Sequence, residues 1–303
     1  MQKSFIVLLF ICTWPLLVIS QEDSLSPKKI AKRKLYIASG ASGLTIGSLV
    51  ALNQAWYADY NTGQFHFFND NAEWLQMDKV GHTWTNYQLA RLMMGTFKWA
   101  GYSKKQQLLY GGSIGFAYMT CIEVMDGFSK GWGFSWGDEM VNAFGTTLAL
   151  VQHAYWDRQK IQIKFSYASS GLAKYNPALL GKKPSTQILK DYNGQTYWLT
   201  CNPFDFVKTQ NKFPKWLNIA LGYNASGMLG ANQNKILIYD EHSNAITFNR
   251  ERHFLFSLDV DLSRIKTKSR VLQKVFSLVN ILKFPAPTID FTSHGIKFHY
   301  FYY

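Results

Sequence analysis

Three ionisable side chains lie within five residues of one another in the segment WLQMDKVGHTWTNYQLAR, residues 74–91, and they are Asp78, Lys79 and His82. Asp78 and His82 are four residues apart, so on a helix both face the same side. A carboxylate in that position can accept a hydrogen bond from the imidazole and fix its orientation, as it does behind metal-binding and acid–base histidines, or it can pair with Lys79. The pair is therefore suited to anchor a binding or reactive centre.

Two later segments of low polarity carry further carboxylates. Glu123 and Asp126 lie near the end of segment 101–127, and Asp138 and Asn142 form another pair spaced by four residues. We predict that all these groups join in one buried polar cluster, because polar side chains in apolar helices need partners. The predicted members are Asp78, Lys79, His82, Glu123, Asp126, Asp138 and Asn142. The alternative is that each pair only caps or solvates the end of its own helix.

The predicted cluster has enough ligands for a metal ion, with Asp78 orienting His82 from behind. However, neither a His-Glu-x-x-His motif nor a two-histidine motif occurs, and one histidine among carboxylates is a weak pattern for zinc. The stretch GFSWG matches Gly-x-Ser-x-Gly, but no apolar strand precedes it and Ser135 is suited to cap a helix. The sequence therefore leaves the metal, the cofactor and the catalytic residues open.

Four helices are expected to position these residues, at 35–56, 70–101, 101–127 and 133–159. Asp70, Ser103 and Ser135 are suited to cap the second, third and fourth of them. Ser135 precedes Asp138 by three residues, a spacing like that of a capping box. We therefore predict a four-helix bundle over residues 35–157.

After Arg158 the apolar period changes from about 3.6 residues to 2. Alternating apolar and polar residues predict half-buried strands at 161–167, 216–223, 252–264 and 295–303, and a short one at 235–240. Segment 269–284 carries an apolar stripe of helical spacing, made of Val271, Val275, Leu278 and Leu282. The predicted fold class is α+β, with a helical bundle followed by an antiparallel β-rich module, 158–303, that contains one amphipathic helix.

The first twenty residues, MQKSFIVLLFICTWPLLVIS, have the form of a cleaved export signal, and we expect the mature protein to begin near Gln21. Cys12 follows Ile11 rather than a small residue, so it does not resemble a lipid-attachment cysteine. Cleavage would leave Cys121 and Cys201, which are too few for a disulfide scaffold. Two free thiols or one bridge both remain open.

The composition points to a membrane or its surface. Hydrophobic residues make up 47% of the 303 residues and charged residues only 17%, while the formal net charge is +13. Part of this charge lies in a basic arm, 21–34, directly before the uncharged run 35–56. Such an arm suits anionic lipid head groups, although a solvated arm is an equal alternative. No zinc-finger spacing or RNP-type motif occurs, so a nucleic-acid partner is not expected.

The last strand adds to this expectation. Ile296, Phe298, Tyr300 and Tyr302 share one face, an alternation typical of outer-membrane strands. Too few strands are visible for an independent closed barrel, for which about eight is the usual minimum. We expect this aromatic face to cover the helical module or the helix 269–284, and to contribute to association with a membrane.

The residues MDKVGH and IEVMDGFSKGWGFSWGDEMVNAFG resemble the YfiM-like family of predicted periplasmic lipoproteins, a domain of unknown function, in its long Bacteroidetes-type form. More distantly they are similar to VanZ-like membrane bundles, whose motif positions correspond to Asp78, Lys79, His82, Glu123, Asp138, Asn142 and Gly145. The resemblance covers mainly residues 70–157, and the lipobox cysteine of a lipoprotein is missing. It implies a bacterial cell envelope, periplasmic and membrane-associated with the outer membrane favoured, but no established reaction.

Two functions remain. The first is a non-catalytic envelope protein whose polar cluster braces the bundle or binds a lipid or glycan head group. The second is a metal-dependent or acid–base hydrolase of an envelope lipid or cell-wall precursor. A membrane or envelope lipid is the expected partner in both, and protein partners are left open.

Overall fold

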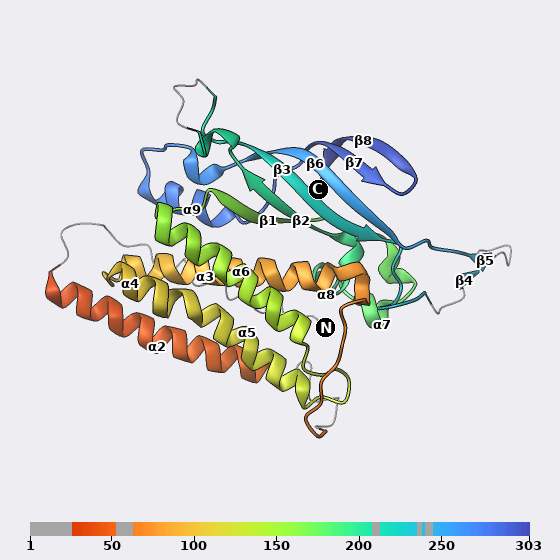
Figure 1. Ribbon diagram of the computed structural model, residues 1–303, viewed down its shortest axis with the longest axis horizontal. Coiled ribbons are helices and arrows are strands. Elements are labelled where there is room, and N and C mark those ends of the chain that lie inside the picture. Colours follow the sequence, from red (N-terminus) through yellow and green to blue (C-terminus); the bar gives the residue numbers. More distant parts are fainter. Residues whose placement is uncertain (1–25, 53–62, 208–212, 235–237, 240–244) are drawn as a thin grey trace. The chain divides into compact units, whose positions relative to one another are not determined.

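The computed structural model describes residues 26–52, 63–207, 213–234, 238–239 and 245–303 (Figure 1). The chain has the α+β fold class, with long helices and an antiparallel six-stranded sheet. It divides into two compact units. The helical unit comprises the described residues up to Asp70 together with His82–Gln159, and the sheet unit comprises Asn71–Gly81 and Lys160–Tyr303. The predicted export signal and the cleavage before Gln21 lie outside the described residues.

The long helices of the helical unit are α2 (Pro27–Leu52), α3 (Met77–Trp99), α5 (Gly112–Gly127) and α6 (Trp136–Trp156). A short α4 (Lys104–Gln106) leads through a π-helical turn, Gln107–Gly111, into α5. Ser103 caps α4 and Ser135 caps α6, because each side-chain oxygen accepts a hydrogen bond from the backbone three residues later. Both predicted serine caps are confirmed.

The basic segment was expected to precede the first helix as an arm, but α2 already begins at Pro27. A proline at the first helical position suits this start, because its missing N–H would have no helical partner there. Arg33 is buried, and its guanidinium donates a hydrogen bond to the carbonyl oxygen of Trp99 (2.9 Å) and lies 4.4 Å from the Trp99 ring. The start of α2 is therefore tied to the end of α3.

The prediction that Asp70 caps the second helix is wrong. The chain instead forms a 3-10 turn, Glu73–Gln76, before α3 begins, and Trp74 and Leu75 in it have left-handed φ angles of 47° and 49°. Trp74 holds this uncommon backbone, because its ring is buried 5.4 Å from that of Tyr192 and its N–H donates to Ala231 (2.7 Å). Packing thus overrides the capping signal.

Glycines let α3, α5 and α6 approach closely. A Cβ atom at Gly145 would lie 2.2 Å from the backbone oxygen of Thr83, and one at Gly111 would lie 2.9 Å from the Cα of Met94. Side chains therefore cannot occupy these positions without moving a backbone, as in other close helix crossings.

The six-stranded sheet has the order β1-β2-β3-β6-β7-β8, and every neighbouring pair is antiparallel. Its strands are β1 (Ile161–Tyr167), β2 (Gln195–Cys201), β3 (Leu217–Ser226), β6 (Glu251–Val260), β7 (Ala286–Thr292) and β8 (Gly295–Tyr302). A separate two-stranded ribbon pairs β4 (Ile238–Tyr239) with β5 (Ala245–Ile246). Short helices α7 (Pro177–Leu180) and α8 (Pro184–Lys190) precede β2, and α9 (Arg270–Val279) precedes β7.

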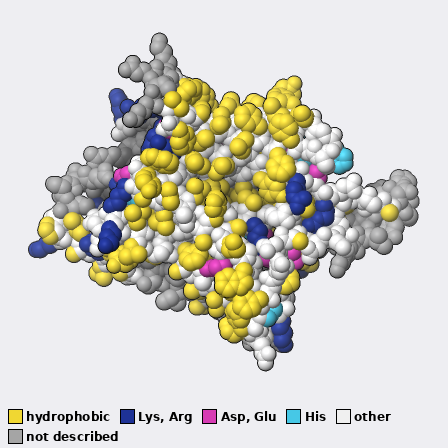
Figure 2. Space-filling view, in the orientation of Figure 1, with side chains coloured by type: hydrophobic (Ala, Val, Ile, Leu, Met, Phe, Trp, Pro, Cys, Tyr) yellow, Lys and Arg dark blue, Asp and Glu magenta, His cyan; other side chains and the backbone are white. Residues whose placement is uncertain are grey.

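One face of this sheet is apolar and exposed from β2 to β8, and we call it the apolar sheet face. Registers Leu199↔Leu221, Leu221↔Phe256, Phe254↔Phe291 and Phe291↔Ile296 place its side chains together. Its exposed members are Leu199, Leu221, Phe254, Phe256, Leu258, Phe291, Ile296, Phe298 and Tyr300. Figure 2 shows hydrophobic side chains gathered over these strands. The prediction that the aromatic face of the last strand is covered is therefore wrong, since Phe298 and Tyr300 are 57% and 78% exposed.

The opposite face of the sheet is buried and largely polar, around a small apolar cluster of Trp198, Ala220 and Leu255. Lys164 donates a hydrogen bond to Oδ1 of Asn280 (2.9 Å), whose Nδ2 donates to Gln162 (2.7 Å) and to Asp261 (3.0 Å). All these residues are buried, so β1 is covered on both sides rather than half-buried as predicted. Alternation in the sequence identified β1, β3, β6 and β8, but the face that it would have placed in the core is the exposed one over most of the sheet.

The predicted helix 269–284 ends earlier, at Val279, with Ser269 as its N-cap. The chain then pairs with β1, because the N–H of Phe165 donates to Ile281 (3.0 Å) and the N–H of Lys283 donates to Phe165 (2.9 Å). Val271, Val275 and Leu282 of the predicted apolar stripe are exposed. Cys121 and Cys201 are free thiols.

Candidate functional site

His82 of α3 lies at the centre of the polar cluster in the helical unit. Its Nδ1 is 3.1 Å from Oδ1 of Asn142 on α6, and the amide of Asn86, one turn later on α3, also donates to that oxygen. Asn86 is in turn 3.5 Å from the hydroxyl of Thr146. Because Oδ1 of Asn142 is an acceptor, Nδ1 of His82 is assigned as the N–H donor.

Two carboxylates flank the imidazole on its two sides. Oε1 of Glu123, on α5, is 3.9 Å from Nδ1 of His82, and Oδ1 of Asp138, in the first turn of α6, is 3.8 Å from Nε2. The histidine therefore stands between one carboxylate from α5 and another from α6. These distances are longer than hydrogen bonds and leave the charges to act through space.

Ser135 links the carboxylates of Glu123 and Asp70 to the first turn of α6. Its hydroxyl donates to Oδ1 of Asp70 (2.6 Å) and accepts from the N–H of Asp138 (3.2 Å), while its own N–H donates to Oε2 of Glu123 (3.4 Å). This serine thus acts as a helix cap and as a link within the cluster. A nucleophilic role for the GFSWG match is not favoured, since no strand leads into Ser135.

The cluster is closed to solvent around the imidazole. His82 is 6% exposed, Asp138 3%, Glu123 1%, and Asn142 and Asn86 0%. The Nδ2 group of Asn142 has no hydrogen-bond partner within the described part of the chain. A substrate therefore has no access to the imidazole in this conformation.

The structure brings His82, Glu123, Asp138 and Asn142 together. Asp78 lies one turn before His82 on α3, and its carboxylate accepts a hydrogen bond from the hydroxyl of Tyr192. Lys79 is the next residue in the chain. It is buried and interacts with another group of the protein. Asp126 is also buried, and its backbone oxygen accepts from the N–H of Ser129 (2.9 Å) where α5 ends.

Two residues that hydrogen-bond within the cluster, Asn86 and Asp70, were not among its predicted members. Asn86 follows His82 by four residues, the same spacing that singled out Asp78, so this signal was present but not used. Asp70 was assigned to a helix cap, and only the tertiary structure shows that it accepts from Ser135. Its distance of 65 residues from Ser135 in the sequence carries no local signal.

The assigned tautomer has a chemical consequence. In a neutral imidazole with its proton on Nδ1, the lone pair lies on Nε2, the nitrogen 3.8 Å from Oδ1 of Asp138, and histidines that bind metals commonly donate their other N–H in this way. The residues of the helical unit that could hold a cation are therefore His82 and Asp138. This ligand set is small, since structural zinc usually has four ligands.

Comparison with known families matches the part of the chain that contains the cluster to a family of unknown activity. Residues 66–154 match the family described as predicted periplasmic lipoprotein (DUF2279). The matched range contains α3, α5 and most of α6, and with them all seven residues of the predicted cluster. The match does not extend to the YfiM-like name or to VanZ-like proteins. No curated protein and no solved structure matches the chain.

Proposed function

We propose that this chain is a non-catalytic, membrane-associated protein of the bacterial cell envelope, and that its polar cluster braces α3, α5 and α6 as a four-helix bundle with α2. The single observation that carries the bracing role is the closure of the cluster around the imidazole. His82 meets Asn142 and Asp138 from α6 and Glu123 from α5, and none of these four residues is more than 6% exposed.

The physical basis of bracing is the low polarity of the surroundings. A buried polar group without a partner costs several kcal/mol, so helices that present His82, Glu123 and Asp138 are stable only in the arrangement where these groups meet. The cluster therefore selects one packing of helices whose apolar side chains alone would allow several.

The location in the envelope is supported by the match of residues 66–154 to predicted periplasmic lipoproteins. The proposal includes an N-terminal export signal and a distant likeness of the helices to VanZ-like membrane bundles. It places the protein at the outer membrane. The apolar sheet face supports association with a membrane, because a contiguous exposed apolar surface of this kind marks contact with lipid or a partner.

Two measurements test this proposal. The full chain, purified in detergent, should float with phospholipid vesicles after detergent removal, in high salt as well as low. The paired change Phe254→Asn and Phe298→Asn should weaken flotation, whereas Phe204→Asn, an exposed phenylalanine in the turn after β2, should not. Wild-type protein that stays soluble and apart from vesicles would end the membrane proposal.

The hydrolase alternative is favoured by one observation, the distance of 3.8 Å between Nε2 of His82 and Oδ1 of Asp138. A metal there would stabilise the fold, so a chelator would lower the melting temperature and Zn²⁺ would restore it. Bracing without a metal predicts the same melting temperature with and without the chelator. The experiment thereby separates the metal-dependent form of the hydrolase from bracing without a metal.

A further inference from the structure

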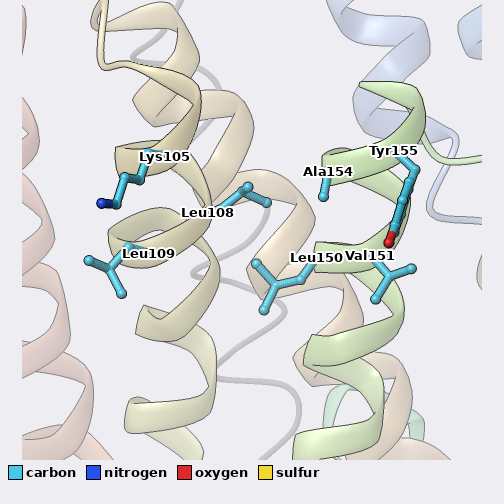
Figure 3. A pocket seen from close by; sticks show the side chains of 7 residues that line it. All are labelled: Lys105, Leu108, Leu109, Leu150, Val151, Ala154 and Tyr155. Carbon is cyan, nitrogen blue, oxygen red and sulfur yellow. The ribbon is translucent and has the colours of Figure 1, made fainter.

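A groove of about 590 Å³ lies between the beginning of the α4–α5 segment and the end of α6 (Figure 3). It is lined by Lys105, Leu108, Leu109, Leu150, Val151, Ala154 and Tyr155. Figure 3 shows Leu108 and Leu150 facing the space between the two helices from opposite sides. The volume falls within the range of small-molecule sites, roughly 300–1,000 Å³.

The lining of this groove is almost entirely hydrocarbon. Among its side chains only the ammonium of Lys105 and the hydroxyl of Tyr155 are polar. Leu109, Val151 and Tyr155 are exposed, so the groove opens on the surface. A peptide would find few partners for its backbone N–H and C=O groups here, whereas an alkyl chain needs none.

The groove is continuous with an uncharged outer surface on α5 and α6. Of the charged residues in these two helices, Glu123, Asp126 and Asp138 are buried, and Glu139 is partly buried and accepts a hydrogen bond from Thr120 (2.6 Å). The exposed positions carry apolar or small side chains instead. They include Ala117, Cys121, Val124, Met140, Phe144 and Val151.

The length of this surface matches a bilayer. From Trp136 to Trp156, α6 rises about 30 Å, close to the thickness of a hydrocarbon core. Among the described residues, one helix, Lys104–Gly127, is long and apolar enough to cross a membrane. Trp136 and Trp156 are both exposed, one at each end of α6, where interfacial aromatic residues are enriched.

The groove end of the helices is also the basic end. Lys98 and Lys104 share Asp157, at 2.7 and 3.5 Å, so their charges are partly balanced. Lys105 lines the groove and has no ion pair within the described ranges of the chain, and in Figure 3 its flexible side chain extends away from α6. The contact of Arg33 with Trp99 brings the basic start of α2 to this same end.

We propose that this groove binds one anionic phospholipid, with an acyl chain against Leu108, Leu150 and Val151 and the phosphate on the ammonium of Lys105. The inference rests on the membrane association proposed above and names the lipid class and its site. Basic and aromatic residues at one end of an apolar helical surface are the arrangement that meets an anionic head-group layer.

The test uses the full chain in detergent and native mass spectrometry, with phosphatidylglycerol or phosphatidylcholine of the same acyl chains added in increasing amounts. Wild-type protein should retain phosphatidylglycerol at concentrations about fivefold lower than phosphatidylcholine, since one lysine near a lipid phosphate contributes about 1 kcal/mol. Lys105→Glu should remove this preference. Val151→Trp, which fills the groove, should weaken the retention of both lipids.

Lys130→Glu is the matched control, because Lys130 is an exposed lysine in the turn between α5 and α6 at the other end of the helices. It should leave the lipid preference unchanged. Inorganic phosphate should fail to displace the lipid, which distinguishes a lipid site from a phosphate site. Equal retention of the two lipids by wild-type protein, or an unchanged preference in Lys105→Glu, would overturn the groove assignment even where the protein still floats with vesicles.

Discussion

Nζ of Lys164 lies 2.8 Å from Oδ2 of Asp259, and neither side chain has any exposed surface. Lys164 projects from β1 and Asp259 from β6, on the buried polar face of the sheet. Lys164 also donates to the backbone oxygen of Val260 (2.9 Å). The pair is thus part of the core of the sheet unit, where a hydrophobic pair would usually stand.

Removing one member of this pair should destabilise the sheet unit strongly. Lys164→Met leaves the carboxylate of Asp259 buried beside fewer cations, and we expect a loss of about 3–5 kcal/mol. Adding Asp259→Asn should recover part of that loss, because the remaining charge is then removed as well. Chemical denaturation in detergent of Lys164→Met, Asp259→Asn and the double variant measures these values, and strictly additive effects would show that the pair is not coupled.

Stability should rise with pH between about 8 and 10.5 because of Lys283. Burial lowers the pKa of its ammonium to about 8, against the opposing effect of Asp259, and Lys164 lowers it further. The unfolded chain, with an ordinary lysine pKa, binds more protons in this window, so deprotonation favours the folded state as pH rises.

The Lys283→Met variant should lose this rise and should be more stable than wild type at pH 7. The ammonium lies 4.2 Å from the ring of Trp198, so a methionine of similar length keeps that contact. Thermal melting from pH 7 to 10 provides the comparison. If the melting temperature of wild type falls steadily over this range, and that of the variant falls in parallel, the lowered pKa of Lys283 is contradicted.

His82→Ala should lower the stability of the helical unit by about 3 kcal/mol, because Glu123 and Asp138 then remain buried without the imidazole. His294→Ala is the control, since His294 is exposed and its ion pair with Glu251 lies at the surface. Melting temperatures in detergent report both changes. Similar small shifts in the two variants would argue against bracing by the cluster.

Gly145→Ala should destabilise the contact between α3 and α6 by about 1–3 kcal/mol, since the new methyl group would lie 2.2 Å from the oxygen of Thr83. Gly95→Ala makes the matched comparison. Gly95 lies in α3, and an added methyl group there would point into open space, so alanine should stabilise the helix by about 0.5–1 kcal/mol. We expect the melting temperature to fall in Gly145→Ala and to rise in Gly95→Ala. Shifts in the same direction would contradict the close approach of α3 and α6 at Gly145.

The helices and most long strands could be predicted from local patterns, because apolar spacing and caps such as Ser103 and Ser135 are encoded within a few residues. Which face of the sheet is buried could not be predicted in this way. In β6, alternation identifies two faces but not which one meets the core, and the structure buries Ser257 and Asp259 while exposing Phe256. Polar partners such as Asn280, far away in the sequence, decide that orientation.

The candidate site shows the same division. Its histidine and carboxylates stood out because charged residues are rare in these helices, so the partners of His82 on α5 and α6 were among those predicted. The strands β2 and β7 were missed as strands, since QTYWLTC has no strict alternation and β7 contains Pro287. The left-handed turn at Trp74 depends on a buried ring and on Ala231, neither of which a local pattern reveals.

The exposure of the apolar sheet face and the burial of the opposite face also affect which substitutions the sheet tolerates. At Phe256 a relative could replace one apolar side chain with another of different shape, because lipid or solvent imposes no fitted neighbour, whereas at Ser257 even an added methyl group meets the buried network with Thr288. The polar positions of this sheet would then evolve more slowly than the apolar ones. A hydrophobicity profile of relatives would therefore mistake its most variable positions for the core.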